Sequence, residues 1–260
     1  MSTPSLPPIS RRALLVTASG SALAGCAGGA GGHVSAAAAR PARANTPPQS
    51  SRTHPGHLPP GLPDQIEHGP RTSHKVALTF HGQGDPALAE SLLTTAEKAG
   101  AHLTVMAVGT WLDAHPAMAR RVLAGGHELG NHTQRHVDIG ALDAAQARAE
   151  IEGCAEKLQG LTGSRGRWFR PSQARLTTPL VVGLARQAGY PHVLSYDVDS
   201  LDWTDPGPAK VRAVVAGQVR PGSVVSLHFG HPGTLAALPG ILADLHRRGL
   251  RAVTTSELLT

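Results

Sequence analysis

Short β-rich segments alternate with longer helical segments from residue 71 to the end of this 260-residue chain, and this alternation constrains the fold most strongly. Strands are expected at residues 75–80, 102–108, 127–131, 167–170, 193–198, 223–227 and 252–254. Helices are expected at residues 86–99, 116–124, 144–161, 179–188, 209–217 and 235–248. Several helices end in glycine, at Gly100, Gly189 and Gly249, which suits a left-handed C-terminal cap. The pattern predicts one α/β domain with a parallel sheet, and the number of strands favours a (β/α) barrel.

The first 25 residues read as an export signal rather than as part of this fold. Arg11 and Arg12 precede a short stretch of apolar and small residues, which suits the apolar region of a cleavable signal. The paired arginines resemble a twin-arginine signature. The sequence Leu-Ala-Gly-Cys at residues 23–26 resembles a bacterial lipobox, which implies lipidation of Cys26 and anchoring at the outer face of the cytoplasmic membrane or in the cell envelope. The alternative is an ordinary cleaved signal with an incidental cysteine.

Residues 26–70 are rich in Gly, Ala, Pro, Ser and Arg and have no helical or strand period, which predicts a disordered tether. The globular domain is therefore expected at residues 71–260. Five of the 24 basic and two of the 18 acidic residues precede it, which leaves 19 against 16 and a net charge of +3. This charge is too small for a nucleic-acid-binding surface, so no nucleic acid is expected among the partners.

Histidine is unusually frequent, with fifteen in the chain, and two of them lie close together after a predicted strand. His132 and His136 are four residues apart, a spacing that places two imidazoles on one face of a helical turn. Two neutral imidazoles and one carboxylate can form an open catalytic zinc site. In a chain with so many histidines the same spacing can also arise by chance.

Four further motifs follow other predicted strands. The strand 76–80 leads into His81-Gly82-Gln83-Gly84-Asp85, and Trp-Phe-Arg-Pro occupies residues 168–171. Asp-Ser-Leu-Asp-Trp occupies residues 199–203, and the strand 224–227 ends in His228. Together with the paired histidines, these segments resemble in order the five motifs of the polysaccharide deacetylase (NodB-homology, carbohydrate esterase family 4-like) family. The resemblance covers residues 73–260.

The resemblance implies a deformed (β/α) barrel that binds a divalent metal, with zinc as the expected ion, and removes acetyl groups from N-acetylated cell-envelope polysaccharide. His132 and His136 match the two metal histidines, and His228 matches the general acid that protonates the leaving amine. The remaining matches are Asp199 or Asp202 as the carboxylate that orients the acid, Arg170 as the residue that holds the catalytic base, and Trp203, Leu227 and Gln173 around the substrate pocket. Trp203 and Leu227 are also compatible with ordinary core positions.

The first motif departs from the family pattern Thr-Phe-Asp-Asp-Gly, in which one Asp is the base and the next is a metal ligand. His81 and Gly82 occupy those two positions, so both carboxylates are missing. Asp85 could be a metal ligand, or it could cap the helix that starts at Pro86. His81 could be a third metal ligand, a replacement base, or part of an inactive site. Gln173 lies where the third motif also departs, which changes the shape of the pocket.

Two functions therefore remain open from the sequence. The first is a metal-dependent deacetylase acting on an envelope glycan, and the intact His132, His136, Arg170 and His228 favour it. The alternative is a catalytically degenerate lipoprotein that binds glycan or metal without turnover, which the missing carboxylates favour. The expected partners are an N-acetylated glycan and, through Cys26, a membrane.

Overall fold

The computed structural model describes residues 58–260, which form a single α/β domain. The predicted export signal, the lipobox with Cys26 and most of the predicted tether lie outside the described residues. Within residues 58–260, none of the helices combines the length and the apolar character needed to cross a bilayer.

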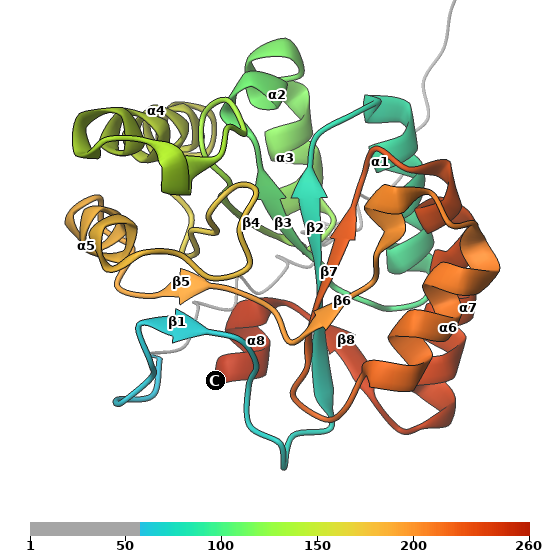
Figure 1. The fold of residues 1–260 in the computed structure, drawn as a ribbon. Coiled ribbons are helices and arrows are strands. Elements are labelled where there is room, and N and C mark those ends of the chain that lie inside the picture. Colours follow the sequence, from blue (N-terminus) through green and yellow to red (C-terminus); the bar gives the residue numbers. More distant parts are fainter. Residues whose placement is uncertain (1–57) are drawn as a thin grey trace, which may run out of the picture. The chain divides into compact units, whose positions relative to one another are not determined.

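The centre of the domain is a parallel sheet built around one long strand, β2 (Figure 1). β7 pairs with one edge of β2, whereas β3 and β8 pair with successive parts of its other edge. β4 continues the sheet beyond β3, and β6 continues it beyond β7. These six strands are β2 (Lys75–Gly82), β3 (Thr104–Ala107), β4 (Glu128–Asn131), β6 (Val198–Asp199), β7 (Val224–His228) and β8 (Arg251–Val253).

A second parallel pair extends the sheet beyond β4. β1 (Gln65–Ile66) pairs with β5 (Val193–Leu194), and Phe169 forms single bridges to both Asn131 and Val193. The path of strands therefore runs from β6 to β1 through Phe169. The pairings confirm the predicted parallel α/β sheet, and closure into a complete barrel remains a prediction because the paired path does not form a ring.

Helices surround this sheet, with α1, α6 and α7 on one flank and α4 and α5 on the other (Figure 1). They are α1 (Pro86–Lys98), α2 (Gly109–Ala114), α3 (Ala117–Ala124), α4 (Ala144–Thr162), α5 (Pro179–Gln187), α6 (Pro208–Gln218), α7 (Pro232–Arg247) and α8 (Thr255–Leu259). Two short 3₁₀ turns lie at Ile139–Ala141 and Asp202–Thr204. Gly100, Gly189 and Gly249 have φ values of 66°, 95° and 67°, which confirms the left-handed conformation predicted after α1, α5 and α7.

The alternation of side chains along the central strands decides which residues reach the site. In β2, Val76, Leu78 and Phe80 pack against the surrounding helices, and Ala77 packs in the cluster on the opposite face. Because successive strand residues point to opposite faces, His81 belongs to the inner face, at the carboxyl end of the strand. The inner apolar cluster beneath it includes Met106, Trp168 and Val224.

The sequence missed some elements and misjudged others. The segment expected as a strand at residues 167–170 makes only the bridges at Phe169, and the strand expected at residues 193–198 is divided into β5 and β6. Helices α2 and α8 were not anticipated because each has only five or six residues, too few for a periodic apolar pattern.

The tether boundary at residue 70 was also wrong. β1 forms within the segment expected to be disordered, and Ile66 is fully buried against Trp168 and Leu194 in the inner cluster. A two-residue strand carries no alternation, so composition alone hid it. The folded domain therefore begins before β1.

Replacing Ile66 by Ala should lower the free energy of unfolding by about 3 kcal/mol, because it removes buried methyl groups from a packed core. Urea unfolding of the purified protein measures this change. Leu123→Ala is the matched control, because Leu123 is 44% exposed on α3 and should change stability by less than about 0.5 kcal/mol. Equal stabilities of the two variants would show that β1 lies outside the cooperative fold.

Candidate active site and metal centre

The predicted site residues meet at the carboxyl ends of the parallel strands. His81 lies near the end of β2, directly opposite His228 at the end of β7, and His132 follows the last residue of β4. Parallel strands place these ends at one edge of the sheet. A cleft of about 540 Å³ opens there, lined by His81, Gln83, His136, Gln173, Ala174, Arg175, Tyr196, Asp199, Trp203, Ser226, His228 and His231.

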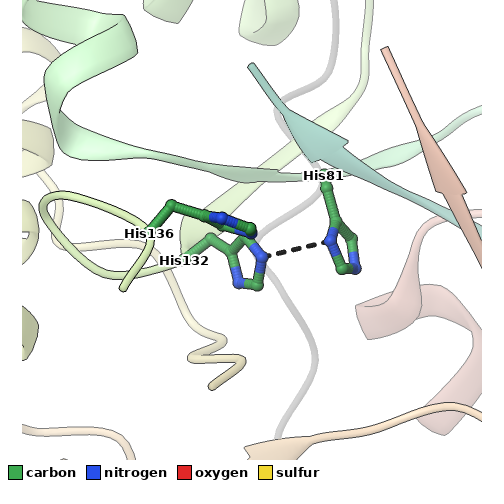
Figure 2. Close-up of side chains that lie close together, drawn as sticks. All are labelled: His81, His132 and His136. Carbon is green, nitrogen blue, oxygen red and sulfur yellow. Dashed lines mark hydrogen bonds between the residues drawn. The ribbon is translucent and has the colours of Figure 1, made fainter. Parts of the chain in front are cut away.

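Three imidazoles form a compact cluster at the base of this cleft (Figure 2). One nitrogen from each of His81, His132 and His136 lies within 4.8 Å of the others. Nε2 of His132 and Nδ1 of His81 are 3.1 Å apart. Tetrahedral coordination with zinc–nitrogen bonds of about 2.0–2.1 Å places two ligand nitrogens roughly 3.3 Å apart, so this pair already has the spacing of a metal site.

The segment that carries His132 and His136 is a strained loop rather than the predicted helical turn. Thr133 and His136 have φ values of 67° and 57°, a left-handed conformation that is unfavourable for a β-branched residue such as Thr133. The side chain of Asn131 accepts a hydrogen bond from the Thr133 amide, and the Thr133 hydroxyl accepts one from the His136 amide. This reversal of the chain, rather than helical spacing, brings the two rings to a centroid distance of 4.8 Å.

Burial keeps the cluster uncharged. Desolvation lowers the pKa of His81 and of His132 well below the ordinary value, and the neighbouring histidines and Arg170 lower both further. Burial also lowers the pKa of His136. These imidazoles are therefore neutral at pH 7, which is the form that binds metals.

The donor set fits a divalent transition metal. Nδ1 of His132 donates to the carbonyl oxygen of Arg170 at 3.0 Å, which leaves the lone pair of Nε2 facing His81. Nε2 of His136 is buried and has no hydrogen-bond partner in the described structure, as expected for an atom that awaits a ligand. Three imidazoles with no carboxylate suit zinc, copper or nickel better than magnesium or calcium.

Asp85 is not part of this cluster. Its carboxylate accepts a hydrogen bond from the Ala87 amide at 2.9 Å and caps α1, which is the alternative that the sequence left open. The side chain is exposed, and the three-residue cluster around His81 does not include it. Gly82 offers no side chain, so among the described residues no carboxylate joins the three imidazoles.

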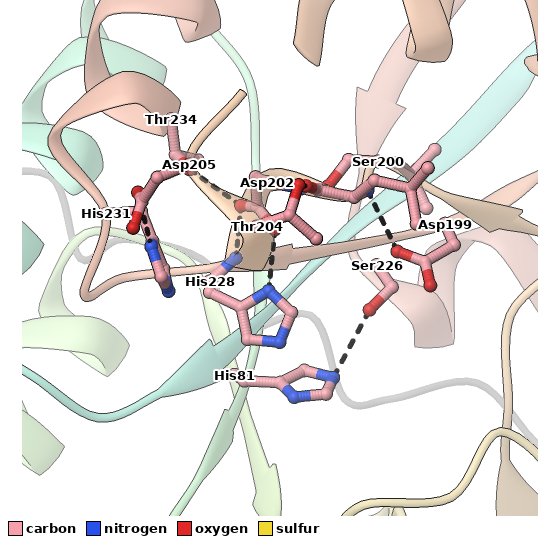
Figure 3. Close-up of polar contacts among 12 residues, drawn as sticks. His81, Asp199, Ser200, Asp202, Thr204, Asp205, Ser226, His228, His231 and Thr234 are labelled. Carbon is pink, nitrogen blue, oxygen red and sulfur yellow. Dashed lines mark hydrogen bonds and ion pairs between the residues drawn. The ribbon is translucent and has the colours of Figure 1, made fainter. Parts of the chain in front are cut away.

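His228 is held by a buried carboxylate, as predicted, and Asp202 supplies it (Figure 3). Nδ1 of His228 donates to Asp202 at 2.7 Å, and the His228 amide donates to the other carboxylate oxygen at 2.8 Å. The Thr234 hydroxyl donates to the same oxygen at 2.6 Å. Burial alone would raise the pKa of Asp202, but these hydrogen bonds outweigh it and lower the pKa. Asp202 is thus an anion. Because it binds Nδ1 of His228, the other ring nitrogen, Nε2, stays available to the cleft.

Asp199, the other candidate for this role, does not contact His228 in this way. Its carboxylate accepts a hydrogen bond from the Leu201 amide at 3.0 Å and lies on the wall of the cleft (Figure 3). The two aspartates differ in their contacts with His228. Asp199 ends β6, whereas Asp202 starts the following 3₁₀ turn, which brings its carboxylate to the end of β7.

Arg170 lies beside the imidazole cluster, and its role in holding a catalytic base stays a prediction, because the described residues place no carboxylate base there. Its guanidinium is fully buried and donates to the Thr79 hydroxyl and to the carbonyl oxygens of Leu194 and Ser195. It also lies 5.4 Å from the centre of the Tyr196 ring. Burial lowers its pKa to about 10, so it remains a cation at neutral pH. Its positive charge acts on His81 through space and favours the neutral imidazole.

The pocket residues were predicted only in part. Trp203 lines the cleft and is 53% exposed. Gln173 also lines the cleft, and its own backbone is left-handed, with φ of 57°. Leu227, in contrast, is fully buried in the core beside the helices, so its assignment to the pocket was wrong. Ser226 faces the cleft instead. The period of two in β7 could have shown this, because residues 226 and 228 share a face.

Other cleft residues had no signal in the sequence motifs. Tyr196 and Arg175 line the wall near Gln173. His231 forms an ion pair with Asp205, with 2.8 Å between Nδ1 and the carboxylate (Figure 3). His231 lies three residues after His228, and Asp205 lies three residues after Asp202. Both are outside the sequence motifs that contain His228 and Asp202.

Known proteins resemble this chain over most of its length. A polysaccharide deacetylase family model matches residues 68–193. A peptidoglycan-N-acetylglucosamine deacetylase from Bacillus cereus is 32% identical over 197 residues, covering 73% of this chain and 90% of that protein. A chitooligosaccharide deacetylase from Bradyrhizobium sp. is 28% identical over 200 residues, covering 68% and 87%. Among solved structures, a carbohydrate esterase family 4 pseudoenzyme from Bacillus anthracis shares the fold, with a TM-score of 0.72 and 23% identity over 76% of this chain and 70% of its own.

The depressed pKa values of His81 and His132 predict that the metal-free protein loses stability in mild acid. The unfolded chain takes up protons on these residues below about pH 6.5, whereas the folded state resists protonation, so the free energy of unfolding falls as pH decreases. Each histidine contributes a slope of up to about 1.4 kcal/mol per pH unit. Urea unfolding in the presence of a chelator, between pH 7.5 and pH 5, measures the slope.

His81→Gln should remove one histidine's share of this slope, and His246→Gln should leave it unchanged because His246 is exposed on α7. An unaltered slope in His81→Gln would contradict the burial of His81 as a neutral group.

Proposed function

The chain belongs to the polysaccharide deacetylase family, and from this premise we propose that it is a metal-dependent hydrolase that removes acetyl groups from N-acetylated glycans of the cell envelope. The family contains hydrolases of carbon–nitrogen bonds, and the relatives above are deacetylases of peptidoglycan and chitooligosaccharide. The observation that carries the proposal is the position of the imidazole cluster beside the His228–Asp202 pair in one cleft.

His81, His132 and His136 would hold the metal ion, and zinc is among the ions that suit their all-imidazole donor set. When bound, a divalent ion supplies Lewis acidity toward the acetyl carbonyl and lowers the pKa of water. Of the roles left open for His81, the third-ligand role fits best, because its Nδ1 already faces Nε2 of His132 at 3.1 Å.

His228 would supply the proton that the leaving group needs. Cleavage of an amide releases an amine, which leaves readily only when its nitrogen is protonated. His228 can donate from Nε2 while Asp202 holds Nδ1, and the two hydrogen bonds to Asp202 fix the ring relative to the cleft. The ring centroids of His228 and His81 are 4.2 Å apart, so the proton donor and the proposed metal ligands can reach one acetamido group.

The second candidate is a protein of this family that binds metal or glycan without turnover. The observation in its favour is that residues 58–260 place no carboxylate in the imidazole cluster, so the base of the family motif is not supplied there. The Bacillus anthracis protein that shares this fold is itself described as a pseudoenzyme. The two candidates share the metal site and differ in acetate release.

We further propose that the protein is exported and lipid-anchored through Cys26. The support is the pair Arg11-Arg12, the following apolar segment and the Leu-Ala-Gly-Cys sequence. An envelope location would place the cleft beside its proposed glycan substrate.

The enzyme proposal predicts one tightly bound zinc ion per chain and release of acetate from an oligomer of N-acetylglucosamine. His228→Gln should keep the zinc and reduce the rate at least about 100-fold, because it removes the proton donor. His132→Ala should lose the zinc. Metal analysis and an acetate assay on the purified protein measure both quantities, with His246→Gln as the control histidine outside the cleft.

Stoichiometric zinc without acetate release from the oligomer, from peptidoglycan or from an acetyl ester would favour the binding protein. Absence of zinc from the wild-type protein would contradict both forms of the metal-site proposal.

The anchoring proposal predicts that wild-type protein, produced in a bacterium that processes lipoproteins, partitions into detergent and has a lipid-modified N-terminal peptide that begins at Cys26. Cys26→Ser should move the protein to the aqueous phase. Detergent partitioning and mass spectrometry of the N-terminal peptide measure this. A wild-type N-terminus without lipid would overturn the anchor while leaving the enzyme proposal intact.

A further inference from the structure

Ser226 is the residue that meets the outer nitrogen of His81. Its hydroxyl oxygen lies 3.3 Å from Nε2 of His81 (Figure 3), whereas His132 contacts Nδ1, the other nitrogen of that ring. Ser226 lies in β7, opposite Thr79 of β2, and is only 1% exposed. We propose that Ser226 is a positioning residue that holds His81 in the tautomer whose Nδ1 lone pair can bind a metal, an inference that rests on the proposed metal centre.

In the metal-free protein the hydrogen bonds define one arrangement of protons. The Arg170 carbonyl can only accept, so Nδ1 of His132 carries a proton and its Nε2 is an acceptor. The 3.1 Å contact between the two rings therefore requires Nδ1 of His81 to donate. Nε2 of His81 is then the unprotonated nitrogen, and the Ser226 hydroxyl donates to it.

Metal binding demands the opposite tautomer of His81. The Nδ1 lone pair must face the ion, so the proton leaves Nδ1 and one proton arrives at Nε2, with no change in the charge of the ring. The new Nε2–H needs an acceptor, because an unmade hydrogen bond in a buried site is costly. The Ser226 oxygen provides it after the hydroxyl rotates, since a hydroxyl can either donate or accept.

This arrangement gives both His81 and His132 a partner for the ring nitrogen that faces away from the proposed ion. The Nδ1–H of His132 donates to a backbone carbonyl oxygen, and the Ser226 oxygen would accept a hydrogen bond from the Nε2–H of His81 in the same way. Outer partners of this kind orient metal-bound imidazoles and commonly change metal affinity 10- to 100-fold. An alanine at residue 226 would leave the Nε2–H of His81 without its acceptor. Ser226→Ala should therefore weaken zinc binding roughly 10- to 100-fold.

The tautomer can be observed directly by nitrogen-15 NMR of the histidine side chains in the wild-type protein. His81 should carry its proton on Nδ1 without metal and on Nε2 after one equivalent of zinc. A zinc-bound His81 protonated on Nδ1 would overturn the proposal without recourse to any variant.

Zinc affinity, measured by competition with a chromogenic chelator, tests the role of the hydroxyl. Ser226→Thr retains the hydroxyl and should bind zinc within a few-fold of wild type, whereas Ser226→Ala should not. Ser200→Ala is the matched control, because Ser200 is equally buried but its hydroxyl contacts the Asp202 amide rather than the cluster. Equal affinity of wild type and Ser226→Ala would overturn this inference alone, whereas a wild-type protein without zinc affinity would overturn the proposed metal centre.

Discussion

The parallel pairing of β2 with its neighbours is the constraint on which the site depends. The register places His81 opposite His228 on one side and opposite Met106 of β3 on the other. β4, paired to β3, then delivers His132 to the same edge. A shift of one residue in β2 would turn His81 toward the helices and Phe80 into the cleft. The apolar contacts of Val76, Leu78 and Phe80 with the outer helices thus fix the register and, with it, the position of the chemistry.

Charge in the buried part of the site follows from what surrounds it. Arg170 is a buried cation that donates hydrogen bonds to a hydroxyl and two carbonyl oxygens of the described residues, so dipoles solvate its charge. Three imidazoles near such a cation are most stable when uncharged. The one buried anion of the site, Asp202, is shielded behind His228. The cleft therefore separates a neutral imidazole cluster from the His228–Asp202 pair, which contains the buried anion.

The sequence predicted the α/β fold and the principal histidines because both leave strong local patterns. The strand that ends at His228 and the helix caps at Gly100 and Gly189 are examples. It could not choose between Asp199 and Asp202, because that choice depends on the 3₁₀ turn that folds Asp202 beneath β7. β1 was missed because its two residues are stabilised by tertiary pairing alone. Leu227 adjoins His228 in the motif, but successive residues of a strand point to opposite faces, so Leu227 packs against the outer helices and not in the pocket.

His81 and Gly82 stand where the sequence resemblance places the two carboxylates of the first motif, and the surroundings of both positions suit the residues present. The Cβ of a side chain at residue 82 would lie 2.8 Å from Val105 Cγ1 and 3.1 Å from the Ala107 Cα, so β3 would have to shift to accept an aspartate there. His81 contributes a neutral donor where the family motif has a charged residue, and an imidazole, unlike a carboxylate, needs a partner for its second nitrogen. Ser226 lies at the place where that partner is required. Residues 81, 82 and 226 are thus consistent with the metal centre proposed above, in which Ser226 supports the second nitrogen of His81.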